Sequence, residues 1–371
     1  MNVAKWLFSW FLSGCVGLGL VGCSTPRTST VVMGEQNVTK STFYAGDTFC
    51  SVLGLAQVLN QRTNDVYVVG QIGTLVLDGE TGIVKMSIPF RSSETLVRPE
   101  LIRQEKLGRY QLLSRGGGYG TMGVLDLNGQ AVWQKPAFTP EGGWVYDMTL
   151  GEQSGTGSFY YVAGSEGLTK LDGRGAVVWH QGLSGLGVGF CAHASDPFVL
   201  YHVDDPDESR QIAVYDLAGH RLRSFTPPYR LRDFQVLQWN RKSLMAYASG
   251  PRLVVTDLNG EVALFHRFMG WLGQQTISSL ISVPVRFDPE DDEFLAVCVT
   301  FKSGRGPSML CIFDPEGALI YKEQLPRALG MTTRRYAGEM RETLLVGATS
   351  VIWQYAVAPG FRLKARVISS R

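Results

Sequence analysis

Pairs of short apolar runs recur along the chain, and each pair is joined by a polar segment that contains Asp and Gly. Three examples are "TLVLDGETGIVKM" ending at Met86, "LTKLDGRGAVVWH" ending at His180 and "LVVTDLNGEVALF" ending at Phe265. The aspartates of the six clear copies are Asp78, Asp126, Asp172, Asp216, Asp257 and Asp314. An Asp side chain bonds backbone N–H groups two residues on, and Gly tolerates a positive φ, so each copy predicts a β-hairpin.

The hairpins repeat at a nearly constant period. Successive aspartates lie 48, 46, 44, 41 and 57 residues apart, and a seventh copy, "IWQYAVAPGFRLK", has Ala356 in place of the Asp. A further apolar run precedes each hairpin, and a weaker one precedes that, so each period predicts four strands. Four strands recurring about every 45 residues predict an all-β, seven-bladed propeller of four-stranded blades over residues 47–371. The longest interval makes residues 268–287 the candidate for an added functional loop.

The glycine-rich stretch "RGGGYG" (115–120) has two readings. Such a loop cradles a phosphate when a helix follows it, because the helix N-terminus holds the anion. Here the next residues have the pattern of a strand, and no Gly-Lys-Ser or Gly-Lys-Thr is present. We therefore expect a hairpin turn in blade two.

The N-terminus predicts a lipid anchor. Residues 1–22 have one early lysine and an apolar stretch too short to span a bilayer, as in a signal peptide. Leu20-Val21-Gly22-Cys23 resembles a bacterial lipobox, which implies that Cys23 is lipidated and becomes the mature N-terminus, with palmitate among its acyl chains. Residues 23–46 are rich in Ser and Thr and predict a flexible tether. Ser24 in place of Asp implies, by the same resemblance, an outer-membrane protein that faces the periplasm.

The first three repeats resemble the PQQ-like, or quinoprotein-type, propeller repeat, in which Leu-Asp, Thr-Gly and a following Trp recur. Asp126 with Trp133 and Asp172 with Trp179 retain the Asp and the Trp. Together with the lipobox, the plan is similar to that of the propeller scaffold lipoproteins of the outer-membrane β-barrel assembly machinery. That family usually has eight blades, whereas this chain has seven repeats.

The net charge argues against nucleic-acid binding, and the positions of two cysteines allow a disulfide. The formal net charge is +2, so there is no electrostatic case for nucleic-acid binding. Cys298 and Cys311 lie symmetrically about the turn expected at 302–307, which allows a disulfide across a hairpin in an oxidising compartment. Free core thiols are the alternative.

The sequence contains no motif typical of a catalytic or metal-binding site. The five histidines lack metal-ligand spacing, and the acidic runs at 204–208 and 288–293 lack the pattern of a calcium loop. We therefore expect no catalytic residues, no metal and no cofactor. Aromatic and Met side chains in inter-blade loops are favoured anchors for protein partners, which makes Trp144, Met269 and Trp271 the candidates. The alternative is that each Trp caps the core of its own blade.

The resulting prediction is a membrane-anchored scaffold that binds another envelope protein or peptide, with a role in outer-membrane assembly. Two alternatives remain open, a periplasmic propeller enzyme and a lipoprotein that binds a small ligand or carbohydrate. Addition of an extended segment to the edge of a blade is one mechanism of recognition.

Overall fold

The computed structural model describes the greater part of the chain, in segments. These segments are 38–48, 52, 54–59, 64–70, 73–89, 100–104, 109–114, 121–126, 131–136, 144–153, 157–192, 197–203, 211–231, 233–268, 276–288, 292–301, 307–335 and 341–357. They belong to one compact unit, Val32–Arg371. Within them, twenty-eight strands form seven antiparallel sheets of four strands each, which confirms the seven-bladed propeller.

The strands of each blade follow one another along the chain. Blade one consists of β2 (Gly54–Leu59), β3 (Asn64–Val69), β4 (Gly73–Asp78) and β5 (Val84–Pro89). Blade two consists of β6 (Glu100–Gln104), β7 (Arg109–Ser114), β8 (Thr121–Asp126) and β9 (Ala131–Pro136). Blade three consists of β10 (Val145–Gln153), β11 (Gly157–Gly164), β12 (Gly167–Leu171) and β13 (Val177–Gln181). Blade four consists of β14 (Gly185–Cys191), β15 (Phe198–Val203), β16 (Ile212–Tyr215) and β17 (Arg221–Phe225).

The same order holds for the next two blades and is broken in the last. Blade five consists of β18 (Asp233–Trp239), β19 (Lys242–Ser249), β20 (Arg252–Asp257) and β21 (Val262–Arg267). Blade six consists of β22 (Ile277–Val285), β23 (Phe294–Phe301), β24 (Ser308–Phe313) and β25 (Leu319–Leu325). Blade seven consists of β26 (Ala328–Arg335), β27 (Glu342–Ala348), β28 (Val351–Val357) and, as its outermost strand, β1 (Val38–Ala45).

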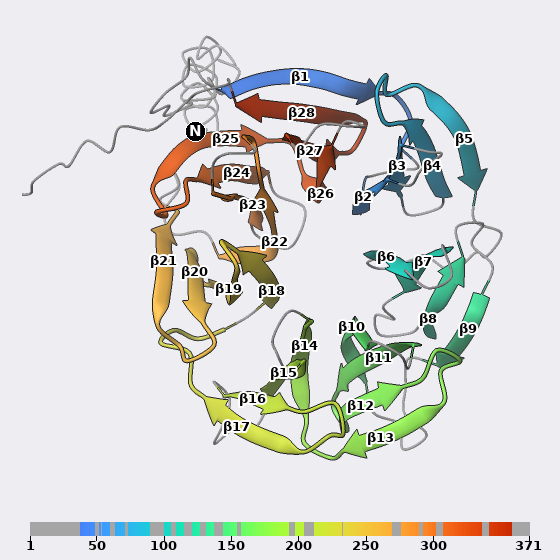
Figure 1. The fold of residues 1–371 in the computed structure, drawn as a ribbon, viewed down its shortest axis with the longest axis vertical. Coiled ribbons are helices and arrows are strands. Elements are labelled where there is room, and N and C mark those ends of the chain that lie inside the picture. Colours follow the sequence, from blue (N-terminus) through green and yellow to red (C-terminus); the bar gives the residue numbers. More distant parts are fainter. Residues whose placement is uncertain are drawn as a thin grey trace, which may run out of the picture. The chain divides into compact units, whose positions relative to one another are not determined.

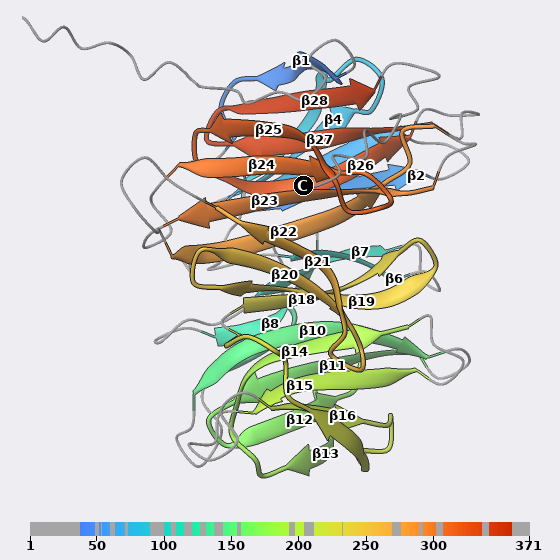
Figure 2. The same ribbon diagram turned by 90° about the vertical axis from the view of Figure 1, so that its left-hand side faces the viewer.

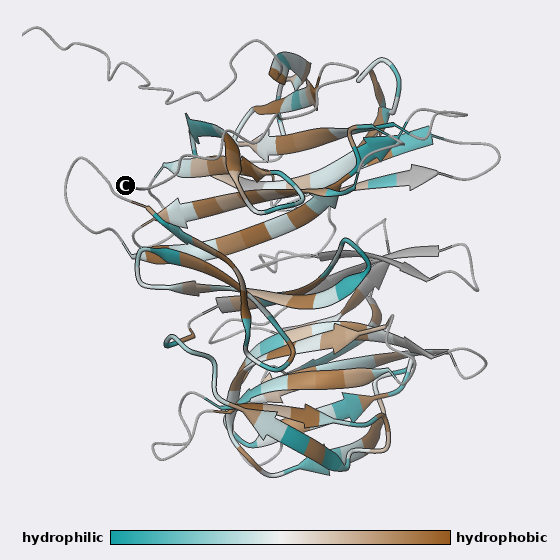
Figure 3. Cartoon of the chain, turned by 60° about the vertical axis from the view of Figure 1, so that its left-hand side comes forward, coloured by the Kyte–Doolittle hydropathy of each residue, from teal (hydrophilic) through white to brown (hydrophobic). Residues whose placement is uncertain are grey.

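Within this unit the blades succeed one another around a central axis (Figure 1). The first strand of each blade lies innermost, and contacts join neighbouring innermost strands, as between β10 and β14 or β22 and β26. Figure 2 shows the same sheets from the side as successive layers. The middle strands β19, β23 and β27 are almost wholly buried, and their residues face the sheets of both neighbouring blades. Figure 3 shows several largely apolar strands, with hydrophilic residues toward some of the turns.

The hairpin chemistry expected from the repeat is present. In blade four, Asp216 Oδ1 accepts hydrogen bonds from the backbone N–H groups of Ala218 at 2.9 Å and His220 at 2.8 Å, and Gly219 has φ +92°. Equivalent bonds and a Gly with positive φ occur at Asp78, Asp172, Asp257 and Asp314. The turn after Asp126 lies outside the described residues. The repeat motif is therefore a turn-forming device.

The ring closes through a strand that the sequence did not predict. β1 pairs antiparallel with β28, from Val38 opposite Val357 to Ala45 opposite Val351. The expected tether over 23–46 is thus wrong in its last part, because residues 38–45 belong to the propeller. The seventh outer strand expected at the end of "IWQYAVAPGFRLK" is also wrong, since β1 occupies that place beside β28. Because β1 completes the sheet that β26, β27 and β28 begin, the described strands form seven blades.

Two further expectations concern loops. Residues 115–120 lie outside the described residues, but β7 precedes them and strand β8 follows them, which confirms a hairpin connection and not a loop that leads into a helix. The interval 268–287 is not mainly an added loop, because residues 277–285 form β22, the innermost strand of blade six.

Candidate interaction surface

Trp144 lies at the entrance to the innermost strand of blade three, immediately before β10. Its backbone N–H donates to Ser165 Oγ at 2.7 Å, and its carbonyl accepts from the Ser165 backbone N–H at 2.8 Å. Ser165 belongs to the turn between β11 and β12. The start of β10 and this turn therefore meet on one face of the propeller. The Trp144 side chain is 39% exposed, so it does not serve only to cap the core of its own blade.

A β-bulge presents a second aromatic side chain two residues further on. The pairing of β10 with β11 shifts between Val145 and Asp147, which leaves Tyr146 as the extra residue. Tyr146 is 45% exposed, whereas Val145 is buried. Bulges re-aim a side chain away from the regular pleat. Trp144 and Tyr146 are thus both exposed at the start of the same strand.

Blade four repeats this arrangement. The pairing of β14 with β15 shifts between Gly185 and Gly187, and the extra residue, Leu186, is 41% exposed. Asp147 Oδ2 accepts a hydrogen bond from the Val188 backbone N–H at 3.0 Å, which joins the two innermost strands just beyond the bulges. A Cβ built on Gly187 would lie 3.6 Å from the same Asp147 oxygen. Tyr146 and Leu186 therefore hold equivalent places on neighbouring strands.

We call Trp144, Tyr146 and Leu186 the entrance patch. Glu166 follows Ser165 in the turn that holds Trp144, and its Oε1 accepts a hydrogen bond from Ser165 Oγ at 3.4 Å. One carboxylate therefore lies close to the patch.

Sequence reasoning found one residue of the patch. Trp144 was a candidate from its residue type and its inter-blade position. Tyr146 was missed, although alternation along "WVY" places it on the same side of the strand as Trp144. Leu186 had no signal, because its exposure depends on the bulge. The other partner candidates, Met269 and Trp271, and the lipidation candidate, Cys23, lie outside the described residues.

The disulfide between Cys298 and Cys311 is not formed. Both thiols are free and buried. Cys298 is paired with Leu310, and Cys311 with Val297, so the two sulfur atoms point to opposite faces of the β23–β24 pair. Burial raises the pKa of each thiol to about 12, which removes the thiolate needed for redox or nucleophilic chemistry.

Among the described residues, His266 takes part in aromatic packing and Glu293 in an ion pair. Within the described residues, no group of three or more His, Cys, Asp or Glu side chains is placed to hold a metal ion. His266 packs edge-on against Phe268 and Phe313, and burial together with the nearby charge of Lys322 lowers the pKa of its imidazole to about 4. Glu293, from the second acidic run, pairs with Arg286 at 3.2 Å.

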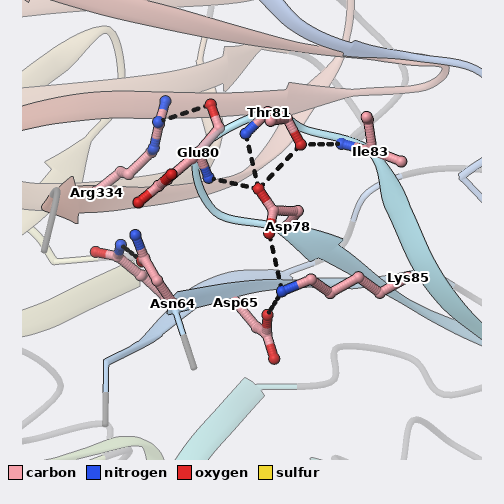
Figure 4. A network of polar contacts seen from close by, with 9 residues as sticks. Asn64, Asp65, Asp78, Glu80, Thr81, Ile83, Lys85 and Arg334 are labelled. Carbon is pink, nitrogen blue, oxygen red and sulfur yellow. Dashed lines mark hydrogen bonds and ion pairs between the residues drawn. The ribbon is translucent and has the colours of Figure 1, made fainter. Parts of the chain in front are cut away.

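A polar network closes the ring between blades seven and one (Figure 4). Lys85 Nζ lies 2.7 Å from Asp65 Oδ1 and 2.9 Å from Asp78 Oδ2, and the bond from Lys85 holds the pKa of the Asp78 carboxyl well below its usual range. The side chain of Arg334, in β26, is buried and donates to the carbonyl oxygen of Glu80 at 3.1 Å. The Lys85 contacts lie within blade one, whereas the Arg334 bond joins blade seven to the hairpin turn of blade one, so we assign this bond to ring closure.

No helix in the described part of the chain has the length and apolar character needed to cross a bilayer.

Comparisons with known proteins establish the fold. No family model matches the sequence, and no curated protein matches it. Among solved structures, BBS1N in complex with ARL6DN superposes with a TM-score of 0.58 at 11% identity, covering 88% of this chain and 98% of that one. A second crystal of that complex, soaked with mercury, gives 0.57 at 11% identity, with 90% and 98% covered. BamB from Moraxella catarrhalis gives 0.46 at 14% identity, with 88% and 98% covered.

At these identities the likeness shows a β-propeller and nothing finer, since propellers host many functions. The resemblance to PQQ-like repeats stays a prediction.

Proposed function

We propose that this chain is a membrane-anchored scaffold of the bacterial envelope that binds another protein through the entrance patch. The observation that carries the proposal is the exposure of Trp144, Tyr146 and Leu186, between 39% and 45%, at equivalent places on two neighbouring blades. Large aromatic and aliphatic side chains that lie together on a rigid surface are the usual anchors of protein interfaces.

The geometry supports a prepared binding surface. The patch stands on innermost strands and is held by the Ser165 and Asp147 hydrogen bonds, so little conformational entropy remains to be lost when a partner binds. Equivalent bulges occur in blades six and seven, but in blades three and four the extra residue, Tyr146 or Leu186, is a large exposed side chain. Side chains that served only to pack the core would be buried.

The fold is suited to this role. BBS1N, which shares the propeller fold at a TM-score of 0.58, was crystallised in complex with ARL6DN. That propeller therefore accommodates a protein partner, and the proposal extends the same use to this chain.

The anchor is the second part of the proposal. Lipidation at Cys23 would leave residues 24–37, fourteen in number, as the tether before β1. A flexible segment of that length has an r.m.s. span of roughly 20 Å, so the propeller would stay close to the membrane. The lipobox and Ser24 favour the outer membrane and the periplasm, and the plan of the chain favours a role in outer-membrane assembly.

Crosslinking in cells tests the proposal. A tagged full-length chain would be crosslinked, purified in mild detergent and analysed by mass spectrometry, beside the variants Tyr146→Ser/Leu186→Ser and Val177→Ser/Val178→Ser. Val177 and Val178 are 60% and 50% exposed on the outer strand of blade three and serve as the matched control. We expect one envelope protein near stoichiometry with the wild type and the control, and its loss with the patch variant. Recovery of the wild-type chain alone would reject the scaffold function.

A further inference from the structure

The ammonium group of Lys40 lies in a cage of aromatic rings closed by one carboxylate. Lys40 Nζ is 2.6 Å from Glu323 Oε1 and lies 4.3 Å from the centroid of the Trp353 ring and 5.7 Å from that of Tyr355. The Tyr321 and Tyr355 rings are 5.8 Å apart at an interplanar angle of 63°. Aromatic faces with a carboxylate are the means by which proteins bind ammonium ligands.

The carboxylate of the cage is held in position by neutral donors. The hydroxyl groups of Tyr321 and Tyr355 each donate to Glu323 Oε2 at 2.8 Å, which leaves Oε1 for the ammonium. Tyr355 is fully buried and Tyr321 is 8% exposed. Burial, followed by the negative charge of Glu323, raises the pKa of Tyr355 far above its usual range, so its hydroxyl stays protonated and keeps donating. The cage is therefore a built site, in which Glu323 has two donors besides Lys40.

The cage lies between two blades, and its occupant comes from the opposite end of the chain. Glu323 and Tyr321 belong to β25 of blade six, whereas Trp353 and Tyr355 belong to β28 of blade seven. Lys40 is paired with Tyr355 in the β1–β28 ladder. One side chain thus ties the closing strand to both blades.

We propose that Glu323, Tyr321, Tyr355 and Trp353 form a binding site for a primary ammonium group, and that Lys40 is its resident ligand. Removal of the Lys40 side chain frees the site for a small alkylammonium ion. Because the resident ligand stands on β1, occupation of the site by Lys40 contributes to holding the closing strand. This inference is independent of partner binding at the entrance patch.

The first test is chemical rescue of the full chain purified in detergent. Lys40→Ala should lower Tm by about 2 °C, the scale expected for one partly exposed ion pair in a domain of this size. Ethylammonium chloride should restore most of that loss in Lys40→Ala and leave the wild type unchanged. Ser41→Ala, at the neighbouring exposed position of β1, is the matched control and should not respond.

Two further solutes distinguish binding of an ammonium ion from an effect of salt or of an uncharged solute. Propanol matches the size of ethylammonium without its charge, and sodium chloride supplies the ionic strength alone. Neither should rescue Lys40→Ala, and ethylammonium should fail in Lys40→Ala/Glu323→Gln. Equal responses of Lys40→Ala and Ser41→Ala to ethylammonium would overturn the proposal.

A double-mutant cycle covers the case in which Lys40→Ala fails to fold. Lys40→Met keeps the aliphatic stem and removes the ammonium, and Glu323→Gln keeps the shape of the carboxylate. If the cage binds the ammonium, the Tm loss of the double variant will be smaller than the sum of the two single losses. Additive losses would mean that Lys40 and Glu323 act independently, and the site would be rejected.

Discussion

Trp179, on the outer strand of blade three, lies against Gly219, in the hairpin turn of blade four. A Cβ built on Gly219 would come within 3.0 Å of the indole ring, and Trp179 Nε1 donates to the carbonyl of Leu217 in the same turn at 3.1 Å. Trp133 lies in the same way against Gly175 of the next blade. The Asp, Gly and Trp of the repeat thus act together across two blades. Asp and Gly form the turn of one blade, and the Trp of the preceding blade packs against that turn.

A pair of glycine substitutions isolates this packing. Gly219 and Gly260 have φ +92° and +91°, but the nearest atom to a Cβ on Gly260 is at 3.7 Å. Gly260→Ala should cost about 1 kcal/mol through its backbone conformation alone. Gly219→Ala should cost roughly 1 kcal/mol more, because the new methyl group displaces Trp179. Urea unfolding of both variants measures the difference, and equal losses would show that the contact contributes nothing.

Adjacent arginines provide a second comparison. Arg334 is buried and donates to Gln354 Oε1 at 2.5 Å and to the carbonyl of Glu80, whereas Arg335 is exposed and pairs with Glu342. Arg334→Met should lower the free energy of unfolding by about 2–4 kcal/mol, because it leaves buried acceptors without a donor. Arg335→Met should lower it by about 1 kcal/mol or less. Thermal unfolding of the two variants would contradict this account if Arg335→Met were the more harmful change.

Acid should destabilise the fold through His266. Its folded pKa is lowered to about 4 by burial and by Lys322, below the ordinary value of 6.5. Between pH 6.5 and 4 the unfolded state therefore binds a proton that the folded state does not, so stability falls as the pH drops through this window. After allowance for screening of the partly exposed ring, this amounts to about 1–2 kcal/mol.

The variant His266→Phe removes that proton from both states, and the new ring suits the neighbouring Phe268 and Phe313. Its free energy of unfolding should decline less than that of the wild type between pH 7 and pH 4.5 in urea titrations. Parallel declines in the two proteins would assign the acid sensitivity to other groups.

Loss of the acyl acceptor tests the anchor. Cys23→Ala should move the protein from the membrane fraction to the soluble periplasmic fraction after cell fractionation, since two or more acyl chains are what hold such a domain on a bilayer. Cys15→Ala, in the apolar stretch of the predicted signal peptide, is the control and should remain with the membrane. Unchanged partitioning of Cys23→Ala would contradict lipidation at this residue.

Local chemistry made most of the fold predictable. The Asp and Gly of each hairpin act within five residues, so the turns and the blade count could be predicted from sequence. The closing strand could not, because β1 pairs with residues more than 300 positions away. Its outward position also leaves Thr39, Lys40, Ser41 and Thr42 exposed, and such a polar run resembles a tether.

The interaction surface was predictable only in part. Residue type and inter-blade position indicated Trp144, whereas Leu186 became visible only through a bulge, which no periodicity signals. Of the two alternatives for Cys298 and Cys311, the structure has free core thiols, because the two residues are one position out of register and a shift of one position moves a side chain to the other face of a sheet.

Site-specific photocrosslinking in living cells tests the central claim most directly. A photoreactive phenylalanine analogue would replace Tyr146 or Leu186 in the entrance patch, and Val177 or Leu222 on outer strands in matched controls, all of them exposed. We predict that light produces the same crosslinked envelope protein from positions 146 and 186 and none from 177 and 222. Crosslinks from the outer strands alone, with none from the patch, would contradict the proposal that this protein binds its partner at the entrance of blades three and four.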